Sequence, residues 1–504
     1  MPPKSCDIPD LRPPYDYGHK APARRRRREM TPNLGLMINN LHSAKMENIL
    51  PDKMYPQLSK AFISRVSYYT KYLARNTYAQ QHVHVGYKTI HDEPGPTQQT
   101  RMSNDIFRPE VLKTIEEEID KYSKDLTDLS LKIHDHPEIK YEERYAHDLL
   151  TAYMESQGFE VTRHYLDLET AWKATFTHGN GGRVLGVNSE MDALPGIGHA
   201  CGHNLIATVG VGISLAVRAA LIKHNVSGKI CLLGTPAEEG GGGKVILIER
   251  GGYKNMDVCL MAHPAAGNPR TAKLGSSQAS QELSVEYQGH PAHASAAPWE
   301  GQNALDAAFI AYGSISALRQ QVKPTHRIHG IVEGRDWAAN VIPDYAKMTW
   351  VTRAPTAKET EALTKRVVKC LEAAALATET KATIKHSIFY YNLTQNTVLV
   401  REFTDVAAKR YGIDASSGIE GAIGASTDFL SPRYILIIPT QPNGGNHTAR
   451  FTESARTKEA HDITFTITKI LALVGFRVLD DELFFKEVHA SFKQTMKITG
   501  DTSL

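Results

Sequence analysis

Short, unbroken apolar runs dominate residues 183–262 and restrict the fold more than any other feature of the sequence. The runs 183–189, 228–234 and 256–262 each suit a strand that is buried on both faces. A long apolar segment of helical length, residues 205–224, separates the first two runs. Strands of this kind occur mainly in parallel sheets whose faces are both covered by helices. The sequence therefore predicts an α/β fold with a mainly parallel sheet and helices on both faces.

Residues 280–390 follow a different pattern and predict a second domain inserted into the first. Strand and helix patterns alternate there in the order β-α-β-β-α-β, which is the arrangement of ferredoxin-like α+β domains. An amphipathic helix, with apolar residues at three- and four-residue steps from Val111 to Ile133, predicts where the folded chain begins. The predicted division is an N-terminal extension (1–105), the two parts of the larger domain (106–279 and 391–485), the inserted domain (280–390) and a C-terminal tail (486–504).

The first 105 residues lack a sustained hydrophobic period and are predicted to be largely disordered. The formal net charge of the chain is +3, and residues 1–30 contribute +4 (eight Lys and Arg against four Asp and Glu), which leaves −1 for the rest. A nearly neutral body gives no reason to expect nucleic acid as a partner. The basic run 24–28 is read as part of a solvated tail and is assigned no function.

The sequence favours a cytoplasmic location. No stretch approaches the run of about eighteen consecutive apolar residues that a membrane helix needs, and the start of the chain has no apolar signal-peptide core. The five cysteines are too few and too scattered for a disulfide framework. We therefore expect reduced thiols and no membrane attachment.

Polar side chains of metal-binding type follow four apolar strand runs. Ligands of open α/β sheets bind beyond the carboxyl ends of the strands, so these side chains are predicted to converge at one edge. A lone histidine after a strand is usually an ordinary hydrogen-bonded residue, but the four glycines after Glu239 suit neither strand nor helix and permit close approach to an ion or substrate. The residues concerned are Glu190, Asp192, Cys201 and His203 after the first run, Glu238 and Glu239 after the second, His263 after the third, and His447 after the apolar run at 433–440.

Five of these side chains are candidate metal ligands. A catalytic zinc keeps three protein ligands and one open position, so five ligands predict two divalent ions that share a water. Glu238 is the neighbouring carboxylate that would take the proton of that water. Thiolate and imidazole ligands favour zinc, with manganese or cobalt as alternatives because a carboxylate is also present. The candidate ligands are Cys201, His203, Glu239, His263 and His447.

Seven motifs support this interpretation: SEMDALPGIGHACGHN, GTPAEEGGGG, MAHP, GHPAHASAAP, NVIP, ASTDF and GNHTARF. In this order they resemble peptidase family M20, the aminoacylase, carboxypeptidase and auxin-conjugate amidohydrolase-like metallohydrolases. The resemblance runs from residue 107 to residue 480 and is greatest to the β-alanyl-lysine dipeptidase-like branch. It implies a di-zinc peptidase-like fold in which the inserted domain is a lid and dimerisation domain.

The resemblance also implies roles for residues of the larger domain. It assigns the same five metal ligands and makes Glu238 the general base and then the general acid. Asp192 matches an aspartate that orients a metal ligand. Many relatives have a metal-binding histidine at the position of Glu190, and we leave Glu190 out of the ligand set.

In the inserted domain the resemblance singles out three residues. His293 matches a histidine that reaches across a dimer to polarise the scissile carbonyl, a contribution worth roughly 3 kcal/mol. Asn340 and Arg353 match positions that hold a substrate carboxylate. The plainer alternatives are that His293 only caps a helix and that Arg353 only pairs with a surface acid.

The expected function is hydrolysis of the amide bond of a dipeptide or N-acyl amino acid by a metal-activated water, and the resemblance favours a basic side chain such as lysine or ornithine. Two alternatives stay open. One is an amidase for a conjugated aryl or secondary-metabolite amide, and the other is a non-catalytic binding or scaffold protein. We expect a small-molecule substrate and a homodimer formed through the inserted domain.

Overall fold

The computed structural model describes residues 106–268, 270–415, 422–423, 433–438 and 444–499. The predicted N-terminal extension, including the basic run 24–28, lies outside the described residues.

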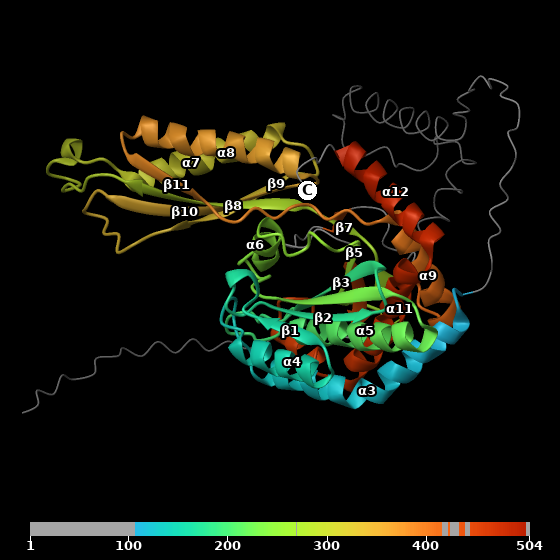
Figure 1. The fold of residues 1–504 in the computed structure, drawn as a ribbon. Helices are drawn as coiled ribbons and strands as arrows, with labels where there is room; N and C mark the ends of the chain where they lie inside the picture. The colour runs from blue at the N-terminus through green and yellow to red at the C-terminus, as the bar shows by residue number, and fades with distance from the viewer. Residues whose placement is uncertain (1–105, 269, 416–421, 424–432, 439–443, 500–504) are drawn as a thin grey trace, which may run out of the picture. The chain divides into compact units, whose positions relative to one another are not determined.

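The larger domain is built on a seven-stranded sheet (Figure 1). In spatial order its strands are β1 (Glu160–Arg163), β2 (Trp172–His178), β4 (Gly228–Thr235), β3 (Arg183–Glu190), β5 (Val258–Ala266), β13 (Arg433–Ile438) and β6 (Ala272–Lys273). The four strands from β4 to β13 are parallel, whereas β1, β2 and β6 pair antiparallel. The sheet is therefore mixed, and the prediction of a mainly parallel sheet holds only for its centre.

Three long helices pack together: the second and third contact the strands of this sheet and cover its apolar centre, and the first packs on those two helices. They are α3 (Pro109–Asp135), α5 (His203–His224) and α11 (Lys458–Asp480). Six of the seven apolar positions at helical spacing in α3 are buried, and Tyr122 is half-buried, so this predicted helix is confirmed. The shorter helix α4 (Arg144–Ser156) contacts β1 and β2, and α6 (Gly243–Glu249) lies on the opposite side of the sheet from α3 and α5 (Figure 1).

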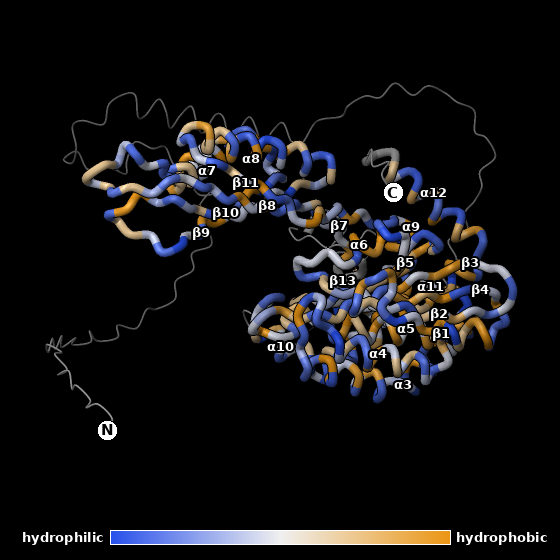
Figure 2. Tube along the Cα trace, turned by 60° about the vertical axis from the view of Figure 1, so that its left-hand side comes forward, coloured by the Kyte–Doolittle hydropathy of each residue, from blue (hydrophilic) through white to orange (hydrophobic). Residues whose placement is uncertain are grey.

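The expectation that no segment is apolar enough for a membrane helix is wrong for helix α5. By length and composition it could cross a membrane, with a mean hydropathy of 2.1 in its most apolar window. In this fold, 83% of that window is buried, and the helix runs through the hydrophobic interior of the larger domain (Figure 2). Burial on all sides by α3, α11 and the sheet accounts for its apolar surface.

The inserted domain has the predicted β-α-β-β-α-β order. Its strands form one antiparallel sheet in the order β11-β8-β10-β9. Side chains of β10 alternate between buried and half-buried, because α7 and α8 cover only one face of the sheet. The elements are β8 (Ala279–Gln288), α7 (Ala304–Leu318), β9 (Arg327–Glu333), β10 (Tyr345–Ala354), α8 (Ala357–Ala377) and β11 (Lys381–His386).

The remaining described elements complete both domains and their connections. Helix α12 includes the start of the segment predicted as a C-terminal tail, and it buries Phe484 and Val488 in the main core. These elements are α9 (Thr397–Tyr411), α10 (Ala449–Ser454), α12 (Glu482–Thr499), the parallel pair β7 (Ser276–Ser277) and β12 (Ala422–Ile423), and three short 3-10 helices (Tyr165–Asp167, Pro298–Glu300 and Arg319–Gln321).

Candidate active site

Potential metal ligands converge beyond the carboxyl ends of the central parallel strands. Within each of three overlapping groups, the ligand atoms lie within 4.8 Å of one another. The groups are Cys201, His203 and His263; Cys201, Glu239 and His447; and His203, Glu238 and Glu239. The structure thus brings together all five predicted ligands and the predicted base, while their binding of metal stays a prediction.

His203, the first residue of α5, is held by Asp192. Its Nδ1 lies 3.0 Å from Asp192 Oδ1, and the other oxygen of Asp192 accepts a hydrogen bond from the N–H of Glu239 at 2.9 Å. Burial would raise the pKa of Asp192, but His203, the N–H of Glu239 and Lys244 together outweigh this effect and keep that pKa below its usual value. Within the described residues, the buried Nε2 of His203 has no hydrogen-bond partner. An imidazole fixed through one nitrogen and open at the other is the usual arrangement of a metal ligand.

Cys201 and His263 face each other across the same site. The Sγ of Cys201 lies 3.3 Å from Nε2 of His263, and Nδ1 of His263 donates to the carbonyl of Pro264. Gly202, between the two ligands of the C-G-H motif, has a φ of 78°, and a Cβ there would lie 2.5 Å from the Pro264 ring. Only glycine allows the turn that aims both Cys201 and His203 at one point.

His447 reaches the cluster from the loop before α10. Its Nε2 lies 3.1 Å from Oε1 of Glu239. Hydrogen bonds with Cys201 and Glu239 raise the pKa of His447 to about 10. The residue has a left-handed φ of 66°, and its N–H donates to the carbonyl of Ala200. The backbone of the loop that contains Cys201 therefore fixes His447, which comes from another loop.

Glu238, the predicted base, is buried, and its Oε2 lies 4.0 Å from Nε2 of His203. The preceding residue, Ala237, has a left-handed φ of 58°, which costs about 1–2 kcal/mol for a residue with a Cβ. Its N–H donates to Oε1 of Glu143 at 2.8 Å, and Thr170 donates to the other oxygen at 2.7 Å. Glu143 thereby holds the strained turn that presents Glu238. Burial, with Asp192 nearby, raises the pKa of Glu143 to about 7.

A fully buried ion pair lies directly behind the ligands. Nζ of Lys244 is 2.9 Å from Oε1 of Glu190, and neither side chain has exposed surface. The other oxygen of Glu190 lies 3.4 Å from Nε2 of His203. The sequence predicted that Glu190 lies at this edge of the sheet but left it out of the ligand set, and nothing in the sequence indicated Lys244 or Glu143.

A cavity of 410 Å³ adjoins the ligand cluster, and both domains line it. The larger domain contributes Glu238, Glu239 and His447, and the inserted domain contributes Arg353 from β10. Burial lowers the pKa of Arg353. The structure therefore places the predicted carboxylate-binding arginine in the same cavity as the predicted base.

The other two predicted residues of the inserted domain do not line this cavity. His293 and Asn340 are exposed on neighbouring loops. The Nδ1 of His293 accepts weak hydrogen bonds from the N–H groups of Ser295 and Ala296 at 3.3 Å, as in the capping alternative. Within one chain these two residues do not line the cavity, so their predicted catalytic and binding roles stay predictions.

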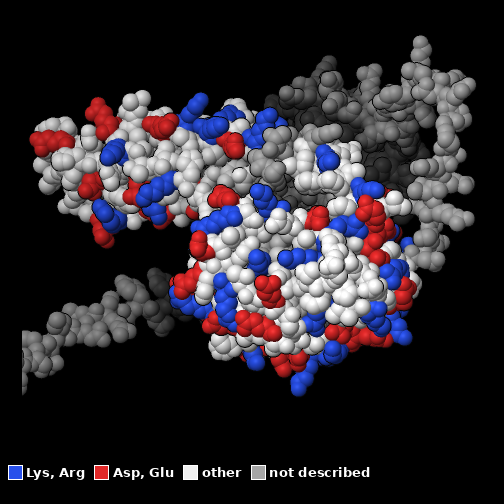
Figure 3. Space-filling view, viewed as in Figure 1, with Lys and Arg blue, Asp and Glu red and all other residues white. Residues whose placement is uncertain are grey.

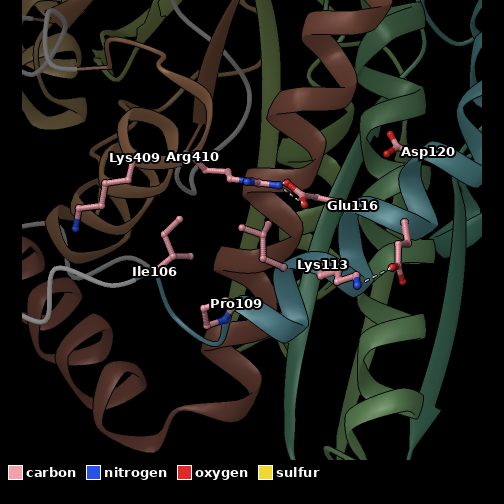
Figure 4. A pocket seen from close by; sticks show the side chains of 9 residues that line it. Ile106, Pro109, Lys113, Glu116, Asp120, Lys409 and Arg410 are labelled. Carbon is pink, nitrogen blue, oxygen red and sulfur yellow. Dashed lines mark hydrogen bonds and ion pairs between the residues drawn. The ribbon is translucent and has the colours of Figure 1, made fainter.

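A larger cavity of 710 Å³ lies elsewhere, between the start of α3 and the end of α9 (Figure 4). Four of its charged groups pair with one another: Arg410 makes two hydrogen bonds to Glu116, and Lys113 lies 3.8 Å from Glu117. None of the predicted site residues lines it. The volume of a cavity alone therefore does not identify the candidate active site.

Comparison with known proteins agrees with this geometry. Residues 277–379 match the peptidase dimerisation domain of family M20. Over 396 residues the chain is 40% identical to Xaa-Arg dipeptidase of Mus musculus, an alignment that covers 75% of this chain and 91% of the mouse protein. The chain belongs to peptidase family M20. It is thus a hydrolase that acts on amide bonds, and the scaffold alternative is set aside.

Two further similarities extend the M20 assignment. The chain is 32% identical over 291 residues to a p-aminobenzoyl-glutamate hydrolase protein of Escherichia coli, covering 54% of this chain and 59% of that protein. A crystal structure from Bacillus subtilis, described as a dinuclear metal binding peptidase of family M20, superposes with a TM-score of 0.52 at 18% identity and covers 71% of this chain and 99% of that one. The fold is therefore shared with solved M20 peptidases.

Proposed function

We propose that this M20 peptidase is a metal-dependent hydrolase of dipeptides or N-acyl amino acids that have a free carboxylate. The observation that carries the proposal is the cavity shared by Glu238, the ligand cluster and Arg353. A base beside metal-type donors supplies the means of hydrolysis, and a guanidinium in the same cavity supplies an anchor for a carboxylate. The name of the mouse relative supports a dipeptide substrate.

The donor set fits divalent metal ions. The Nε2 of His203, which accepts or donates no hydrogen bond among the described residues, and the Nε2 of His263 both face the cluster, and each ring is fixed through its other nitrogen. Soft thiolate and imidazole donors together with the Glu239 carboxylate suit two ions, of which zinc is our first choice. The Bacillus subtilis fold neighbour described as a dinuclear metal binding peptidase supports the count of two.

The residues of this chain would divide the reaction among them. Bound metal ions would polarise the scissile carbonyl and lower the pKa of a water. Glu238 would accept the proton of that water and then donate it to the leaving amine. Asp192 would keep His203 in the orientation observed here, and Arg353 would hold the carboxylate of the substrate.

Metal analysis combined with a substrate panel tests this function. We expect about two divalent ions per chain, hydrolysis of dipeptides or N-acyl amino acids, and loss of turnover with chelator that is reversed by added metal. Cys201→Ala should lower the metal content, whereas Cys370→Ala, in the inserted domain, should not. Undiminished turnover by metal-free protein would refute the proposal.

A second candidate function is hydrolysis of a conjugated aryl amide. The similarity to the E. coli p-aminobenzoyl-glutamate hydrolase protein favours it. The same panel should therefore include p-aminobenzoyl-glutamate. A higher kcat/KM for that compound than for any dipeptide would make this the preferred function.

We also propose a homodimer formed through the inserted domain. Helix α7 exposes Phe309 (63%) and Tyr312 (41%), and β9, an edge strand of the sheet, exposes Ile331 (61%). Exposed apolar side chains beside an unpaired sheet edge are typical of an interface. Charges of both signs are interspersed over the face of the molecule in Figure 3, so apolar contacts rather than opposed charges would drive the pairing.

Phe309→Asp is expected to convert the dimer into a monomer in sedimentation velocity experiments, because a carboxylate would have to be buried at the interface. The monomer should also lose activity if His293 acts across the dimer. Leu376→Asp, at an exposed apolar position of α8 (83%), is the matched control and should stay dimeric. A Phe309→Asp variant that sediments as a dimer would refute this interface.

The proposed location is the cytoplasm. The four described cysteines, Cys201, Cys231, Cys259 and Cys370, are all free thiols. Reduced thiols are the usual state in that compartment.

A further inference from the structure

The cavity contains one carboxylate that hydrolysis does not use. Glu238 and Glu239 belong to the base and the ligand cluster, but Glu282 comes from β8 of the inserted domain. Its side chain is exposed. Among the described residues, none forms an ion pair with the carboxylate of Glu282. A solvated charge facing a substrate cavity is a candidate recognition group.

The strand register fixes where Glu282 lies relative to Arg353. Strands β8 and β10 are antiparallel, with Glu282 opposite Val351 and Ser280 opposite Arg353. These four side chains share the face of the sheet that α7 and α8 leave uncovered, and all four line the cavity. Glu282 and Arg353 are therefore diagonal neighbours, for which the separation is roughly 7–8 Å.

The two charged groups do not reach toward each other. Nε of Arg353 lies 3.4 Å from Nε2 of His329, which is on β9, the strand on the far side of β10 from β8. In the strand register Val351 lies between Glu282 and His329, so it separates Glu282 from the histidine that Arg353 contacts. An apolar strip between an anionic and a cationic group suits a ligand with two charged ends and an aliphatic stem.

We infer that Glu282 selects substrates whose carboxylate-bearing residue also has a cationic side chain. This rests on the proposed function. The carboxylate of that substrate residue binds Arg353, and the guanidinium or ammonium group of the substrate side chain binds Glu282. The methylene groups of the side chain lie over Val351, and Ile388 adds a second apolar side chain to the cavity lining. Glu282 is then a specificity-determining residue, and it takes no part in bond cleavage.

The neighbouring Glu286 provides a matched control. It lies on the same face of β8, further along the strand. It does not line the cavity, and its Oε1 is 3.7 Å from Nζ of Lys385. Glu286→Gln removes the same charge from the same strand at a point that the substrate does not reach.

The test compares Ala-Arg with Ala-citrulline, a neutral isostere, and with Ala-Glu, using the metal-loaded full-length protein. The unaltered protein should prefer Ala-Arg over Ala-citrulline in kcat/KM by at least about tenfold, the effect of one charge-assisted hydrogen bond. Glu282→Gln should bring this ratio close to one, and Glu282→Lys should shift the preference toward Ala-Glu. Glu286→Gln should keep the original ratio.

The outcomes separate this inference from the function on which it rests. If the unaltered protein hydrolyses none of the three peptides, the proposed dipeptidase function fails, and the inference fails with it. If the peptides are hydrolysed but Glu282→Gln keeps the preference for Ala-Arg, only the inference is overturned. Inhibition by free arginine and citrulline gives an independent readout, because Glu282→Gln should weaken inhibition by arginine alone.

Discussion

Replacing Glu238 with glutamine is expected to lower kcat by about 10²–10⁴-fold, the usual contribution of a general acid–base residue. The amide has nearly the shape of the carboxylate but cannot accept a proton from water. The turn that presents residue 238 should persist, because Glu143 holds it through the backbone N–H of Ala237. Steady-state kinetics with metal quantified per chain is the measurement.

Unchanged metal content is the control in this experiment, since Glu238 is not among the five proposed ligands. A variant that has lost both turnover and metal would show that residue 238 supports binding of the ions. A kcat within about threefold of the unaltered protein would remove Glu238 from the mechanism.

Replacing Lys244 with methionine is expected to destabilise the fold by about 3–5 kcal/mol. The change leaves the carboxylate of Glu190 charged, fully buried and without its cation, 3.4 Å from His203. Methionine fills most of the lysine volume, so the lost charge rather than a cavity would cause the effect. Urea unfolding measures it through the midpoint and the slope of the transition.

The double variant Lys244→Met with Glu190→Gln should recover most of this loss, because it removes both charges. Lys223→Met is the matched control: Lys223 is 57% exposed and pairs with Glu117 at the surface, so its loss should cost about 0–1 kcal/mol. A Lys244→Met variant as stable as this control would contradict the view that the buried pair is essential.

Hydrophobic periodicity predicted the elements whose burial is one-sided. The stripe from Val111 to Ile133 in α3 and the alternation in β10 are both visible in the sequence, because one face of each element contacts a core and the other meets water. The order of elements in the inserted domain followed from these patterns.

The edge strand β1 was not predicted from the sequence, whereas helix α5 was predicted from residues 205–224 but was not recognised as long and apolar enough to cross a membrane. The edge strand β1 is exposed or half-buried throughout, so its sequence, EVTR, carries no apolar signal. Helix α5 is buried on nearly every side, and Gly210 and Ser214 interrupt its apolar run while its mean hydropathy remains high. A count of consecutive apolar residues therefore missed how apolar this helix is, whereas the mean hydropathy of a window detects it.

The convergence of the candidate ligands was predictable, because parallel strands end at the same edge of a sheet. The supporting charges were not. Glu143 and Lys244 find their partners far away in the sequence, and a buried charge leaves no local pattern. In the sequence, Glu282 looks like any polar residue of a half-exposed strand. It differs from Glu286 only because it lines the cavity.

The cavity draws its proposed reactive groups from the larger domain and its proposed substrate-binding charges from the inserted domain. Each set has its own hydrophobic core, so a substitution on the open face of β8 or β10 does not disturb the packing that orients His203 or Glu238. New substrates could therefore be acquired in the course of evolution by changes within one contiguous segment of about a hundred residues. Divergence of this kind would leave the proposed base and metal ligands of the larger domain unchanged.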